Sequence, residues 1–69
     1  MVEVFKTNVR EAGEADKVIA LLLHHFPGSK INFDLQDCDK VLRVEGSGFA
    51  AADIIALVSG RGFFCRALE

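Results

Sequence analysis

Alternation between two kinds of hydrophobic spacing is the feature of this sequence that most restricts its fold. In KINFDL, residues 30–35, every second side chain is apolar, which is the period-two pattern of a strand with one buried face. Between residues 12 and 26, by contrast, apolar side chains recur every three or four positions, as in an amphipathic helix. The order in which these two periodicities follow one another predicts the architecture.

Six segments can be distinguished in this way. They are a strand at residues 2–9, a helix at 12–26, a strand at 30–35, a strand at 40–46, a helix at 50–59 and a strand at 63–68. The sequence Phe26-Pro27-Gly28 is a strong helix stop, and the polar QDCD at 36–39 predicts a turn. Residues 30–45 are therefore expected to form a β-hairpin.

This order of segments predicts an α+β fold. Each helix has a single apolar side, so both helices should cover one face of an antiparallel sheet. Right-handed crossovers favour the ferredoxin-like βαββαβ two-layer sandwich with strand order 4-1-3-2. With 69 residues, the whole chain, 1–69, is expected to be a single domain near the lower size limit for independent folding.

Composition and charge exclude several classes of protein. The net charge is −2 and the isoelectric point is near 5.6, so the basic excess of nucleic-acid-binding proteins is missing and no nucleic-acid partner is expected. The longest apolar run, residues 18–23, is far shorter than the roughly 20 residues of a membrane span. The N-terminal segment lacks the pattern of a signal peptide. We therefore expect no membrane association and a cytoplasmic location.

Two longer stretches resemble a known family. FPGSKINFDLQDCDKVLRVEG, residues 26–46, and IIALVSGRGFFCRAL, residues 54–68, are similar to the heavy-metal-associated domain of copper chaperones and metal-transport ATPases. The resemblance covers nearly the whole chain and implies the same βαββαβ fold. In that family, the two cysteines of a Met-x-Cys-x-x-Cys motif hold the metal in the loop after the first strand.

The metal motif of that family is replaced in this chain. When Val9 is matched to the methionine, Glu11 and Glu14 stand where the cysteines belong. Carboxylates are hard ligands, whereas copper(I) and zinc are handed over as thiolates. Acidic residues at the start of a helix also interact with its dipole and its free N–H groups. We therefore predict a degenerate site that binds at most a weak metal ion, and no other cofactor.

The two cysteines are expected to be free thiols. In the predicted strand order, Cys38 and Cys65 are too far apart for a disulfide. Alternation places Cys65 in the core, where a free cysteine packs as a small apolar side chain. Cys38 lies in the predicted turn, at the same end of the sandwich as the glutamates. Two interpretations remain open for it, an incidental turn residue and a contact to a soft metal or a redox partner.

No catalytic constellation is present, and the chain is not expected to be an enzyme. The loop TNVREAG, residues 7–13, has only a passing likeness to the phosphate-binding loop of acylphosphatases, which share this fold class. His24 and His25 form the only histidine pair, at the end of the first helix, where imidazoles interact favourably with the helix dipole.

The outer face of the predicted sheet is a further surface of interest. Alternation places Val4, Val41, Phe64 and Leu68 there, either as scattered exposed residues or as an interaction surface. We expect a small non-enzymatic binding or interaction module that uses this face for a protein partner or a homodimer. The alternative is an atypical metal-binding or metal-transport protein that uses Cys38 with ligands from the loops.

Overall fold

The computed structural model describes residues 1–68 and contains the two helices and four strands in the predicted order. The elements are β1 (Val2–Thr7), α1 (Ala12–His25), β2 (Lys30–Asp34), β3 (Val41–Glu45), α2 (Ala51–Gly60) and β4 (Cys65–Ala67). Both helices begin and end within one residue of their predicted bounds. Neither helix in this part of the chain has the length and apolar character needed to cross a membrane.

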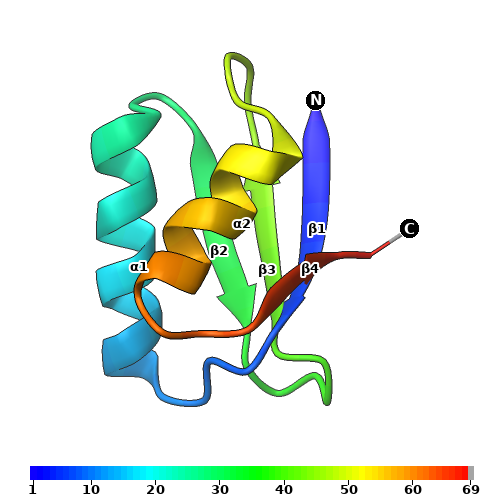
Figure 1. Cartoon of the computed structure of the whole chain (residues 1–69). Helices are drawn as coiled ribbons and strands as arrows, with labels where there is room; N and C mark the ends of the chain where they lie inside the picture. Colours follow the sequence, from blue (N-terminus) through cyan, green and yellow to red (C-terminus); the bar gives the residue numbers. More distant parts are fainter. Residues whose placement is uncertain (69) are drawn as a thin grey trace.

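The four strands form one antiparallel sheet in the order β2-β3-β1-β4. This is the predicted order 4-1-3-2 seen from the opposite edge. Figure 1 shows α1 and α2 on the same face of the sheet, while no other element of the described chain covers the opposite face. The α+β class and the two layers are therefore as predicted.

Strand register places one row of apolar residues beneath the helices. Phe5 of β1 lies opposite Leu42 of β3 on one side and Ala67 of β4 on the other, and Leu42 lies opposite Phe33 of β2. Phe5 and Leu42 are fully buried. The buried apolar residues of the core are Phe5, Val9, Ala15, Val18, Leu22, Leu42, Val44, Phe49, Ile54, Val58 and Cys65.

Helix α1 contributes its predicted apolar stripe to this core. Ala15, Val18 and Leu22 recur at helical spacing, and all three are buried. The helix ends at its C-cap, Phe26, whose N–H donates to the carbonyl of Leu22 at 2.8 Å. Gly28 then turns the chain with φ of 91°, a value that favours glycine.

The first and last strands are shorter than predicted. Pairing between β1 and β4 does not continue through Asn8, because the N–H of Phe64 donates to the side-chain Oδ1 of Asn8 at 2.8 Å. A side chain therefore replaces the next backbone partner and ends the ladder. Val9 is nevertheless fully buried, as its place in the alternation predicts.

Candidate functional site

The turn between β2 and β3 is shaped by aspartate side chains. Asp34 Oδ1 accepts hydrogen bonds from the N–H groups of Gln36 at 3.2 Å and Asp37 at 3.3 Å, the local bonding by which aspartate favours turns. Asp37 Oδ1 in turn accepts from the N–H of Asp39 at 2.8 Å. Lys40 closes the turn with a left-handed φ of 46°, and its N–H donates to the carbonyl of Asp37. The turn is thus a defined structure.

Thr7 fastens this turn to the end of β1. Its hydroxyl donates to the carbonyl of Lys40 at 2.6 Å and accepts from the N–H of Val9 at 3.2 Å. The N–H of Thr7 donates to the carbonyl of Asp39 at 3.0 Å. Thr7 is the buried polar residue of the described chain, and these contacts satisfy it. The turn residues are therefore held against β1.

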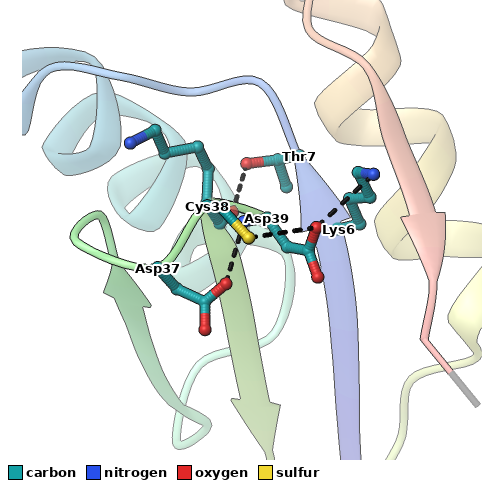
Figure 2. Close-up of polar contacts among 6 residues, drawn as sticks. Lys6, Thr7, Asp37, Cys38 and Asp39 are labelled. Carbon is teal, nitrogen blue, oxygen red and sulfur yellow. Dashed lines mark hydrogen bonds and ion pairs between the residues drawn. The ribbon is translucent and has the colours of Figure 1, made fainter.

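Three potential metal ligands converge on this turn. One ligand atom from each of Asp37, Cys38 and Asp39 lies within 4.8 Å of the other two. Figure 2 shows these three side chains, here called the Asp-Cys-Asp cluster, beside Lys6 of β1. Zinc accepts both thiolate and carboxylate ligands, so the cluster offers a mixed donor set of a kind that zinc tolerates.

Existing contacts compete with any ion at this cluster. The thiol of Cys38 lies 4.0 Å from Asp39 Oδ1, and Lys6 Nζ lies 3.4 Å from the same oxygen. Asp37 and Cys38 are exposed to solvent. A cation would have to displace Lys6 or use the second oxygen of Asp39. The geometry therefore suits a weak, readily exchanging ion rather than a closed structural site.

The glutamates of the predicted metal site are not part of this cluster. Glu11 is the N-cap of α1 and Glu14 lies in its first turn. The expected contact of Glu11 with free N–H groups is wrong for its side chain, which makes no capping hydrogen bond; only its backbone carbonyl bonds, to the N–H of Ala15 at 3.0 Å. The start of α1 and the hairpin turn lie at the same end of the sandwich (Figure 1). Even so, Cys38 gathers with its neighbouring aspartates and not with the glutamates.

The second cysteine and the histidine pair lie elsewhere. Both cysteines are free, and Cys65 is buried in β4, as predicted. Burial raises the pKa of the Cys65 thiol to about 11, so it stays protonated at neutral pH and is a poor ligand. His24 and His25 are exposed in the last turn of α1. Their rings meet edge to face, with the ring centroids 5.5 Å apart. They stand at the opposite end of α1 from Glu11.

The predicted interaction residues differ in their exposure on the outer face of the sheet. Phe64 is 49% exposed, which agrees with an outward position beside the inward Cys65. Val4, Val41 and Leu68 are half-buried, less exposed than predicted. Val4 lies opposite Arg43, and it accepts a hydrogen bond from Leu68 on its other side.

Two like charges divide this outer face. Lys6 of β1 lies directly opposite Arg66 of β4. Because side chains alternate along a strand, Arg66 stands between Phe64 and Leu68 on the outer face. The apolar residues therefore do not form one continuous patch, and Phe64 is bordered by cations. Facing like charges are unfavourable within a sheet, and Lys6 also forms an ion pair with Asp39 at 3.4 Å.

Asp37 and Asp39 are the residues of the candidate site that the sequence interpretation missed. Their only signal is their position on either side of Cys38 in QDCD. Neighbouring side chains point apart in a strand, so the gathering of these three depends on the turn geometry. Comparison with protein-family models, curated protein sequences and solved structures finds no match to this chain.

Proposed function

We propose that the chain is a non-enzymatic interaction module with a ferredoxin-like fold of the heavy-metal-associated type, and that it binds a protein partner through the outer face of its sheet. The observation that carries this proposal is Phe64, a large aromatic side chain that is 49% exposed. The order of elements and strands supports the ferredoxin-like assignment. Glutamates in place of the cysteine ligands support a role other than thiolate metal transfer.

The chemistry around Phe64 supports a protein partner. Aromatic and arginine side chains are enriched among the residues that dominate binding energy at protein interfaces. Phe64 immediately precedes β4 and shares the outer face with Arg66 by alternation, and Arg66 faces Lys6 across the sheet. A partner that places an acidic group near these two cations would relieve their repulsion while covering the ring. The proposal therefore favours a partner with an apolar contact flanked by carboxylates.

Phe64→Ser tests this function, with Phe64→Leu as a matched control that keeps an apolar side chain. Native mass spectrometry of the protein isolated from its own host should show a partner bound to the wild type and to Phe64→Leu, and lost from Phe64→Ser. Circular dichroism should show the same fold for all three. The proposal fails if the wild type carries no partner, or if Phe64→Ser retains it.

A second candidate function is metal binding at the Asp-Cys-Asp cluster, favoured by ligand atoms that lie within 4.8 Å of one another. In this function, Cys38 and its loop neighbours Asp37 and Asp39 together form an atypical metal-binding site. The thiol is the softest ligand of the three and would set the preference for zinc over magnesium or calcium. Lys6 competes for Asp39, so its removal should strengthen binding.

Zinc titration of the reduced protein tests the second candidate. Binding should saturate gradually at an endpoint of one zinc ion per chain, as a weak and readily exchanging site requires. It should disappear in Cys38→Ser and persist in Cys65→Ala, whose thiol is buried. Lys6→Met should bind more tightly than the wild type, because Asp39 is released. An endpoint that survives Cys38→Ser would exclude the cluster. Loss of binding in a Glu11→Ala, Glu14→Ala double variant would place the ion in the loop after β1 instead.

A further inference from the structure

Strand β2 forms one edge of the sheet, with β3 as its only neighbour in the described chain. The N–H of Gly46 donates to the carbonyl of Met1 at 2.9 Å, so the backbone groups of Gly46 point toward β1. These groups alternate in direction along a strand, which turns those of Glu45 toward β2. Glu45 pairs with Lys30, whose backbone groups therefore point back toward β3.

The same alternation directs the backbone groups of Ile31 and Phe33 away from the sheet. No hydrogen bond within residues 1–68 involves these outward N–H and C=O groups. β2 has neither a proline nor a bulge, and its charged residues, which can also protect an edge, stand only at its two ends, Lys30 and Asp34. The other edge, β4, is protected by its length of only three residues. The edge of β2 is thus the better template for a further strand.

We propose that β2 pairs with β2 of a second copy of the chain, antiparallel about a two-fold axis at Asn32. In this register Ile31 lies opposite the partner's Phe33, and the reverse pair follows by symmetry. Both residues of each pair direct their backbone groups outward, as a hydrogen-bonded antiparallel pair requires. The two sheets become one continuous sheet, and the helices of both copies lie on the same side of it.

Charge complementarity selects this occupant and this register. Lys30 and Asp34 flank Asn32 at equal distance along β2, so Lys30 meets the partner's Asp34 at each end of the paired strands. Moving the axis to Ile31 or Phe33 places Asn32 opposite Lys30 or Asp34 and removes both ion pairs. A strand with one cation and one anion placed symmetrically is complementary to its own copy.

The flank of α1 supports the same partner. A shallow hollow of about 290 Å³ lies between α1 and β2, and Ala15, Ile19, Phe33 and Leu35 are among the residues that line it. Leu23 follows Ile19 by four residues, hence on the same flank, and is 38% exposed. Joining the sheets at β2 brings the partner's α1 toward this flank. The second copy would therefore cover apolar surface as well as pair the edge.

A charge-swap experiment tests this dimer. Lys30→Glu and Asp34→Lys each place like charges at both ends of the paired strands, and each should weaken the dimer about tenfold or more in sedimentation velocity. An equimolar mixture should recover it, because the introduced carboxylate meets the introduced ammonium while the native pair stays intact at the other end. Circular dichroism and urea denaturation of each variant check the fold, because Asp34→Lys also removes the acceptor for two N–H groups of the turn and Lys30→Glu meets Glu45 within its own chain. A monomeric wild type at all concentrations, or a mixture that stays monomeric, overturns the proposal.

Asn32→Glu separates the dimer from the fold. Within one chain residue 32 lies opposite Arg43, so the introduced carboxylate gains an opposite charge and stability should be kept or raised. At the two-fold axis the same carboxylate meets its own copy, and the dimer should be lost; Asn32→Gln is the neutral control. Phe64→Ser should leave this dimer unchanged, so the two proposals fail independently. If Phe64→Ser abolishes the dimer and Asn32→Glu does not, the copies meet through the outer face and the β2 proposal is wrong.

Discussion

The hydroxyl of Thr7 is the polar group on which the geometry of the candidate site depends. It donates to the carbonyl of Lys40 and accepts from the N–H of Val9. Thr7→Val keeps the shape but leaves both backbone groups without a partner, and it should lower the free energy of unfolding by about 1–3 kcal/mol. Urea denaturation measures the loss, with Thr7→Ser as the hydroxyl-keeping control. Equal losses in the two variants would show that packing, and not the hydroxyl, is responsible.

Cys65 makes stability depend on pH at the alkaline end. Its ordinary pKa is 9.0, and burial raises the pKa in the folded protein to about 11. Between these values the unfolded chain has released a proton that the folded chain retains. This contribution is therefore fully present below pH 9 and is lost as pH rises toward 11. The free energy of unfolding should fall over this range more steeply in the wild type than in Cys65→Ala; parallel curves would contradict the prediction.

The sequence predicted which face of the sheet a strand residue occupies. It did not predict that the side chains of Asp37, Cys38 and Asp39 converge in the turn. Alternation correctly placed Cys65 inside and Phe64 outside, because adjacent side chains of a strand must point to opposite faces. No such rule links Cys38 to its neighbouring aspartates. Their convergence depends on the left-handed Lys40 and on the hydrogen bonds of the turn, which spacing in the sequence does not reveal.

At the scale of elements, a better N-cap residue at the start of α1 should make the protein more stable. Glu11 has the extended N-cap backbone, φ −110° and ψ 144°, but makes no side-chain cap. Aspartate is shorter and is among the best N-cap residues, so Glu11→Asp should raise the free energy of unfolding by about 0.5–1 kcal/mol. Thermal and urea unfolding would measure this. Glu11→Ala is the control without a carboxylate, and an aspartate variant no more stable than it would contradict the prediction.

The order and type of the helices and strands were predictable from hydrophobic periodicity together with helix-stop and turn residues. The hairpin of β2 and β3 has the predicted faces, since each strand alternates cleanly and the intervening turn is polar. The ends of β1 and β4 were predicted too long. Alternation continues through Asn8 and Phe64, but the ladder ends where the Asn8 side chain takes the N–H of Phe64. Competition between side chain and backbone decides such ends, and periodicity does not report it.

For the whole molecule, one-sided helices were the decisive signal. A helix with a single apolar stripe can cover only one sheet face, which fixed two layers before any contact was known. The distribution of charge over the surface was less predictable. The chain is acidic overall, yet Lys6 and Arg66 face each other on the outer sheet face. Net charge alone therefore hides a cationic region that only strand register brings together.

A small core also makes the whole fold sensitive to single changes. A domain of this length has a total stability of about 3–10 kcal/mol, judged per residue. Leu22 of α1 is fully buried in the core, so Leu22→Ala should cost about 2–5 kcal/mol, a large share of this total. The next residue provides a matched control, because Leu23 is 38% exposed and Leu23→Ala should change stability by only about 0.5 kcal/mol. Urea denaturation monitored by circular dichroism, at concentrations low enough to keep the chain monomeric, measures both. Similar losses at the two positions would mean that α1 is rotated about its axis relative to the sheet.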